Sequence, residues 1–139
     1  VGQAAADFGM RQSFYKVAMR PGKPIMAGHM SQIPIIGLPG NSVSAMVCGE
    51  VFVVPLVQKM LGLPSGHRTR LTAPLAGDLP ANGPRDHYMR GKIVDGELHV
   101  EQRQDSALLT VLNAARVLVV HKVNTPAQPK GMLMEYIPL

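Results

Sequence analysis

The sequence predicts an α/β segment followed by a small, mostly β domain. Residues 33–36 form an apolar run that leads through a glycine loop into a long apolar helix. Beyond residue 62 the apolar residues instead alternate in short segments, as they do in half-buried strands. Asp95-Gly96 stands between two of these segments and is a strong β-hairpin signal. We therefore expect the α/β part in residues 1–62 and a small β-barrel or sandwich in residues 63–139.

The strands and turns of the first part follow from local patterns. Residues 1–8 are rich in alanine and end at a glycine, so we expect the last turns of a helix there. Residues 13–20 alternate along the chain and predict one strand, closed by a Pro-Gly turn. The run 33–36 predicts a buried strand, with Pro34 at an edge or at the start of the strand.

One long helix is expected in the first part. Residues 43–61 are mainly apolar, and Asn41 or Ser42 before them supplies a good N-cap. Pro55 has no amide hydrogen and is expected to kink or divide the helix. Gly62 is expected to end it.

The second part is predicted to consist of strands and one short helix. Alternating or continuous apolar runs predict strands at residues 68–73, 87–94, 97–103, 117–120 and 132–137. A short helix is expected at residues 106–115, because its leucines share one face and Asp105 or Ser106 can cap it.

Composition and charge exclude several classes of protein. The 139 residues carry a net charge of +5, which favours anionic partners such as phosphates and oxyanions. The single cysteine excludes an internal disulfide framework and a cysteine-based zinc site. Aromatic residues make up 4%, so a surface that stacks on nucleic-acid bases would have very few rings available, which weakens that class of function. The five histidines show no metal-binding spacing, so no metal site is predicted in this chain.

No membrane or targeting segment is predicted. The longest mainly apolar stretch, residues 43–63, contains Glu50, Pro55 and Lys59, whereas a bilayer span of about 20 residues tolerates few charges. The N-terminus lacks the basic region and apolar run of a signal peptide. Because the chain begins with Val, we expect a fragment of a longer protein.

A glycine loop between a strand and the long helix is the first candidate site. Residues 37–44 read Gly-Leu-Pro-Gly-Asn-Ser-Val-Ser. The free N–H groups and the positive end of the helix dipole at such a place bind phosphate or molybdate-like oxyanions. The loop matches neither the P-loop nor the dinucleotide-binding glycine pattern. A well-capped turn without a ligand is the alternative interpretation.

Basic residues close to this loop are the second candidate. Lys16 and Arg20 are four residues apart in the predicted strand, so they are expected on one face, and Lys23 follows in the next turn. Together they could hold a phosphate-rich ligand. They could equally line a solvated sheet edge.

Two further residues in the second part could contact an anion. Arg85 precedes the strand 87–94 and could reach a ligand or pair with Asp86 on the surface. Ser106 opens the short helix and could contact a ligand or serve only as its N-cap.

Two of these motifs together resemble the molybdopterin molybdotransferases, the family of MoeA and the gephyrin E domain. They are Lys16-Val-Ala-Met-Arg-Pro-Gly-Lys-Pro24 and Gly37-Leu-Pro-Gly-Asn-Ser-Val-Ser-Ala45. The similarity continues through residues 79–83, 85–90 and 104–106 and so covers essentially the whole chain. It implies that residues 1–62 are the C-terminal part of a three-layer α/β molybdopterin-binding domain, and that residues 63–139 are a C-terminal β-barrel-like domain.

The resemblance also implies roles for particular residues. Lys16 and Arg20 fall on catalytic positions. The substrate-binding positions are Pro39, Gly40, Asn41, Ser42, Ser44, Arg85 and Ser106. The family usually has Pro where this chain has Ser42, and Lys is common where it has Arg20. Arginine keeps the positive charge and presents it as a planar fork.

The implied activity is that of the longer protein. Members of the family insert molybdate into adenylylated molybdopterin and release AMP, assisted by Mg²⁺, whose ligands are expected outside this chain. The resemblance implies a cytoplasmic homodimer that binds neither a membrane nor nucleic acid, and a fragment that is inactive alone. Two other functions stay open: a gephyrin-like scaffold that holds a peptide in an apolar groove between the two parts, and a basic β domain that binds RNA.

Overall fold

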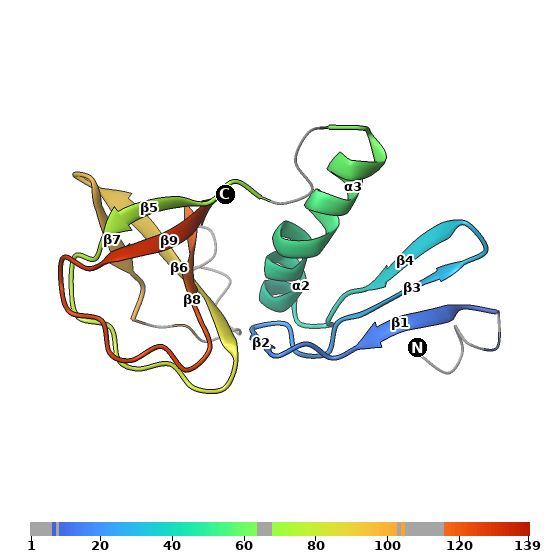
Figure 1. The fold of residues 1–139 in the computed structure, drawn as a ribbon, viewed down its shortest axis with the longest axis horizontal. Coiled ribbons are helices and arrows are strands. Elements are labelled where there is room, and N and C mark those ends of the chain that lie inside the picture. Colours follow the sequence, from blue (N-terminus) through green and yellow to red (C-terminus); the bar gives the residue numbers. More distant parts are fainter. Residues whose placement is uncertain (1–6, 8, 64–67, 103, 105–115) are drawn as a thin grey trace.

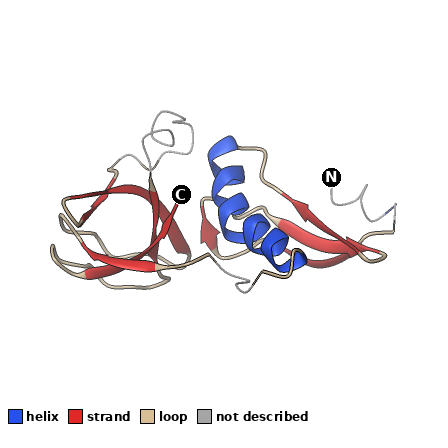
Figure 2. Ribbon diagram, turned by 90° about the horizontal axis from the view of Figure 1, so that it is seen from above, coloured by secondary structure: helices blue, strands red, loops and turns tan. Residues whose placement is uncertain are grey.

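The computed structural model describes residues 7, 9–63, 68–102, 104 and 116–139. The chain forms two lobes, with one long helix standing between them (Figure 1). One lobe is a three-stranded sheet beside the helix, and the other is a small ring of strands (Figure 2). The helix predicted at 106–115, and all but one residue of the helix predicted at 1–8, lie outside the described residues.

The first sheet has three antiparallel strands in the order β1-β3-β4. These are β1 (Arg11–Tyr15), β3 (Met26–Met30) and β4 (Ile33–Gly37). The register places Tyr15, Met26 and Gly37 side by side at one end of the sheet. β4 lies at the edge of this sheet, as expected for a strand that contains Pro34. The prediction of a buried strand is wrong, because Ile33, which is 67% exposed, and Pro34 are exposed and the other residues of β4 are only half-buried.

The single strand predicted for residues 13–20 is two strands in the structure. β1 ends at Tyr15, and Lys16 has a φ of 70°, a left-handed conformation that interrupts an extended strand. β2 (Met19–Arg20) then pairs in parallel with a strand of the second lobe instead of the first sheet. Lys16 and Arg20 therefore do not share one face of one strand, which corrects the prediction.

The long helix runs from Ser42 to Met60 in three segments. They are α2 (Ser42–Cys48), a π-helical turn η1 (Gly49–Val53) and α3 (Val54–Met60). In the wide turn the N–H of Val54 donates to the carbonyl of Gly49, five residues earlier. Pro55 follows directly and cannot donate, and its ring would crowd the carbonyl of an ordinary helical turn, so the wide turn accommodates it. The predicted division near Pro55 and the cap at Asn41 are both confirmed.

The second lobe is a small β-barrel. Its strands are β5 (Leu71–Pro74), β6 (Asp86–Val94), β7 (Glu97–Val100), β8 (Val117–His121) and β9 (Leu133–Pro138). They pair in the order β7-β6-β8-β9-β5, and a bridge between Leu75 and Leu98 brings the end of β5 back to β7. The predicted hairpin is confirmed, since Asp95 and Gly96 both have positive φ between β6 and β7. The α/β plus β-barrel-like class is thereby confirmed (Figure 2).

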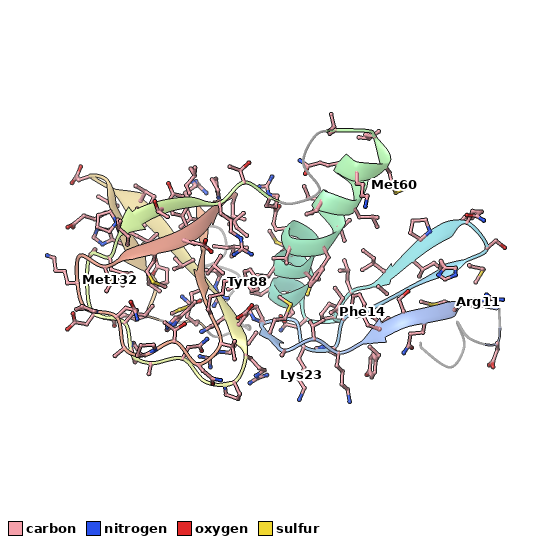
Figure 3. The ribbon with its side chains drawn as sticks, viewed as in Figure 1. Arg11, Phe14, Lys23, Met60, Tyr88 and Met132 are labelled. Carbon is pink, nitrogen blue, oxygen red and sulfur yellow. The ribbon has the colours of Figure 1, made fainter. Side chains whose placement is uncertain are left out.

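Strand β8 is buried on both faces and joins two cores. Val117 and Val119 belong to the core inside the barrel, with Ala73, Leu75, Leu79, Met89, Leu98 and Met134. Leu118 and Val120 belong to a core between the lobes, with Tyr88, Ile137, Met19, Ile25, Val47 and Cys48. Figure 3 shows Tyr88 on the side of the barrel that faces the helix. The outer wall of the barrel is thus the surface on which the first lobe packs.

The helix Ser42–Met60 is long and apolar enough, by length and composition alone, to cross a membrane. In the structure its residues Val43, Val47, Cys48 and Pro55 are buried. Val47 and Cys48 pack in the core shared with the barrel. A single helix of this kind is weak evidence for a membrane span, and 28% of its apolar window is buried in this structure.

Candidate functional site

Lys16 and the glycine loop lie at the same end of the first sheet, where β1 and β4 both finish. β1 and β4 both run antiparallel to β3, which lies between them, so their carboxyl ends lie at the same end of the sheet. The N–H of Lys16 donates to the carbonyl of Ile25 (2.9 Å), one residue beyond the last pair of β1 and β3. Because strands lie about 4.8 Å apart, Tyr15 and Gly37, the last residues of β1 and β4 on either side of Met26, are about 10 Å apart.

Asn41 organises the glycine loop. Its Oδ1 accepts hydrogen bonds from the N–H of Ser44 (3.1 Å) and from the hydroxyl of Ser44 (3.3 Å). Ser44 is buried, as is Pro39, whereas Gly40, Asn41 and Ser42 are exposed. Of the predicted binding residues in the loop, Ser44 therefore supports the helix cap, and Gly40 and Ser42 present accessible groups at the start of the helix.

The Lys16 side chain is exposed at this end of the sheet. Its Nζ lies 5.1 Å from the centre of the Tyr15 ring. An exposed cation–π contact is weak and leaves the ammonium donors available to a ligand. Among the described residues the ion pairs join Arg68 to Glu50 and Arg70 to Glu135, and none involves Lys16.

Arg20 lies at the seam between the lobes, by which we mean the parallel pair of β2 and β6 and the loops beside it. It is in register with His87 across the parallel pair of β2 and β6. Its Nη2 donates to Oδ1 of Asn82 in the barrel lobe (3.2 Å). Asn82 also donates from Nδ2 to the carbonyl of Arg85 (2.8 Å), which is half-buried. Asn82 therefore contacts the guanidinium of Arg20 and the backbone of Arg85, and the charges of both arginines act on His87. The break at Lys16 separates Arg20 from Lys16.

Two buried histidines lie beside these arginines. His87 and His121 pair directly across β6 and β8. Burial lowers the pKa of His87 to about 4, together with the positive charges of Arg20, His121, Arg90 and Arg85. Burial and the charge of Arg20 also lower the pKa of His121. Both imidazoles are therefore neutral near pH 7, and the arginines carry the charge of the seam.

The sequence analysis missed Asn82, Arg90 and the histidine pair. Arg90 is fully buried on β6, where the side chain of Gln104 bonds to its backbone N–H and carbonyl (2.9 Å each). The histidines are far apart in the sequence, and only strand pairing brings them together. Ser106, also predicted as a binding residue, lies outside the described residues.

Among the residues that the structure describes, no three His, Cys, Asp or Glu side chains gather to hold a metal ion. Asp86 at the seam accepts a hydrogen bond from the N–H of Val123 (2.8 Å). A Mg²⁺ site needs several oxygen ligands, usually including one or two carboxylates. The described residues therefore do not fit a Mg²⁺ site.

Two family models match successive parts of the chain. A probable molybdopterin binding domain matches residues 1–59, and the MoeA C-terminal region (domain IV) matches residues 72–139. The chain belongs to the MoeA family of molybdopterin molybdotransferases. The resemblance carried by residues 16–24 and 37–45 is thereby confirmed.

Curated relatives support the same family. The molybdopterin molybdenumtransferase 2 of Mycobacterium tuberculosis is 40% identical over 77 residues, which are 55% of this chain and 19% of that protein. The molybdopterin molybdenumtransferase of Synechococcus elongatus is 31% identical over 123 residues, which are 81% of this chain and 30% of that protein. The chain therefore spans less than a third of the length of these relatives.

Solved structures share the fold of the MoeA-family chain. Two structures of the molybdopterin biosynthesis MoeA protein of Pyrococcus horikoshii have TM-scores of 0.83 and 0.77 at 20% identity. They cover 99% and 94% of this chain and 34% and 33% of the solved chains. A molybdenum cofactor biosynthesis protein of Pyrococcus furiosus has a TM-score of 0.77 at 19% identity and covers 94% of this chain and 46% of its own.

Proposed function

We propose that the longer protein to which this chain belongs inserts molybdate into adenylylated molybdopterin and releases AMP. One observation carries the proposal: Lys16 lies at the same end of the sheet as the glycine loop that starts the helix, and it has no carboxylate partner among the described residues. Cations without such partners favour a ligand rich in phosphate or oxyanion charge. The names of the relatives, molybdopterin molybdenumtransferases, support the same ligand class.

In this proposal the chain supplies two anion-binding places. Lys16 and the exposed start of the helix bind one anionic group at the end of the first sheet. Arg20 and Arg85 bind a second group at the seam. The reaction brings together a pyrophosphate ester and a molybdate dianion, so two such places reduce their repulsion and orient them. Mg²⁺ would be held by carboxylates outside this chain.

We also propose that the longer protein is a cytoplasmic homodimer that binds these small anions rather than nucleic acid or a membrane. The family supports this proposal. Size-exclusion chromatography with light scattering measures the mass in solution. A monomeric mass would contradict the dimer.

AMP release tests the proposed reaction. The longer protein is mixed with adenylylated molybdopterin, with and without molybdate, and AMP is quantified by chromatography. We expect AMP release to depend on molybdate and to fall strongly in Arg20→Ala. Release that is independent of molybdate, or unchanged in Arg20→Ala, would contradict the proposal.

A groove between the lobes favours peptide docking as a second candidate function. Its volume is about 600 Å³, and it is lined by Val51, Phe52, Pro55, Leu56, Lys59, Arg68, Arg70 and Ile137. Its lining is mainly apolar, and Lys59 has no carboxylate partner among the described residues, whereas Arg68 and Arg70 pair with Glu50 and Glu135. Such a lining complements an apolar peptide that carries a carboxylate. Fluorescence polarisation with such a peptide tests the candidate: Leu56→Glu should abolish binding, and equal binding by the wild type and this variant would contradict it.

A further inference from the structure

We infer that Asn82 is a positioning residue that fixes the guanidinium of Arg20 on the loop segment that carries Arg85. The inference rests on the proposed function, in which these two arginines bind an anion. Asn82 is 7% exposed and lies in the loop before β6, at the seam. Its side chain joins the Arg20 guanidinium, which donates to Oδ1, to the backbone of Arg85, whose carbonyl accepts from Nδ2.

The orientation of the Asn82 amide follows from its neighbours. Nδ2 lies 2.8 Å from each of three carbonyl oxygens, those of Arg85, His121 and Lys122. Carbonyl oxygens only accept hydrogen bonds, so the amide nitrogen must face them. The amide oxygen must then face Nη2 of Arg20. The structure therefore presents Arg20 with an acceptor whose direction is fixed.

Hydrogen bonds also hold the backbone around Asn82 in place. The N–H of Asn82 donates to the carbonyl of Thr125, and the N–H of Asn124 donates to the carbonyl of Gly83 (2.9 Å each). Oδ1 of Asn82 also accepts from the N–H of Gly83 (2.9 Å). The loop before β6 is thus joined to the loop after β8. A long arginine side chain that docks on such a rigid acceptor loses less conformational freedom when it binds a ligand.

The acceptor is neutral, and this matters for anion binding. A guanidinium has five N–H donors, so the bond to Asn82 leaves donors for an anion. An aspartate at this position would form an ion pair with Arg20 and cancel the charge that an anion requires. The amide of Asn82 orients Arg20 without reducing its charge.

A double-mutant cycle with molybdate as the probe tests the inference. Calorimetry measures molybdate affinity for the longer protein and for Asn82→Ala, Arg20→Ala and the double variant. We expect Arg20→Ala to weaken binding about tenfold and Asn82→Ala about three- to tenfold. The double variant should bind as Arg20→Ala does, because Asn82 acts through Arg20.

Asp78→Ala is the matched control. Asp78 Oδ1 accepts from the N–H of Lys130 (2.8 Å) and ties the same two loops together at the far end from Asn82. This variant should keep the wild-type affinity. Nitrogen-15 NMR of the Arg20 guanidinium adds a second readout: separate Nη signals in the wild type should merge in Asn82→Ala. Circular dichroism verifies folding. If Asn82→Ala is unfolded, the spectrum of the wild type alone provides the test, because merged Nη signals of Arg20 in the wild type would show that Asn82 does not hold the guanidinium.

The outcomes separate this inference from the proposed function. Equal effects of Asn82→Ala and Asp78→Ala, or additive effects of Asn82→Ala and Arg20→Ala, would overturn the positioning role alone. If molybdate does not bind the wild type, or if Arg20→Ala binds it as tightly as the wild type, the proposed function fails and the inference fails with it.

Discussion

His87 and His121 face one another directly across β6 and β8, and they are 9% and 2% exposed. Arg20 lies in register with His87 on the neighbouring strand β2. A protonated imidazole at this place would be both desolvated and close to a guanidinium. The seam between the lobes therefore requires neutral histidines.

We predict that acid destabilises the fold through this pair. The pKa of His87 is about 4 in the folded chain, and that of His121 is also lowered, against about 6.5 for an unfolded histidine. Between these values the unfolded chain binds more protons, so stability is greatest above about pH 6.5 and falls as the pH drops. The free energy of unfolding should decline by about 1.4 kcal/mol per pH unit for His87. Urea unfolding across this pH range measures the decline.

The control for this prediction is a histidine away from the seam. His87→Gln should remove much of the pH dependence, whereas His29→Gln changes an exposed residue of β3 and should leave it intact. A pH dependence that is equal in the two variants would show that the seam is not its origin.

Gly22→Ala should destabilise the contact between the turn after β2 and the helix. Gly22 has a φ of 113°, and its carbonyl lies 3.8 Å from the Cys48 thiol, which donates to it. A Cβ at Gly22 would overlap Cys48 Sγ. We expect a loss of about 2 kcal/mol or more in the free energy of unfolding, measured with urea. Gly77→Ala, where a Cβ would meet nothing within 4 Å, is the control, and equal losses would contradict the prediction.

Leu118→Ala should destabilise both lobes together. Leu118 is 1% exposed on the outer wall of the barrel and belongs to the core shared with Val47 and Cys48. We expect a loss of about 2–5 kcal/mol in the free energy of unfolding. Circular dichroism follows the whole fold, and reaction of the buried Cys48 thiol follows the first lobe. Coincident transitions are predicted, and separate transitions would show that the lobes unfold independently.

The features that local sequence determines were predicted correctly. The Asp95-Gly96 turn, the Asn41 cap and the division of the helix near Pro55 each depend on residues that are close in the sequence. The break after β1 was missed because Met19 is buried by the other lobe. Its burial reproduces the alternation of a continuous strand, so the pattern could not reveal that β2 pairs with β6.

Only part of the candidate site could be predicted, because the sequence shows local motifs and not the pairing of distant segments. The motifs identified Lys16 and the glycine loop. Because β1 and β4 run in the same direction, Lys16 and the loop lie at the same end of the sheet. Asn82 and His121 take their places through pairing between distant segments. The sequence carries no local signal of such pairing.

The central claim is that cations of this chain bind an anionic substrate rather than stabilise the fold. Calorimetric titration of molybdate into the longer protein and its Lys16→Ala variant tests it most directly. We predict that the free energy of unfolding changes by no more than about 0.5 kcal/mol. Binding should weaken by about 1.5–3 kcal/mol, and more at low salt. Lys92→Ala, which removes an exposed lysine of β6, should change neither quantity. If Lys16→Ala instead unfolds the protein while the molecules that remain folded bind molybdate normally, Lys16 is structural and the account is contradicted.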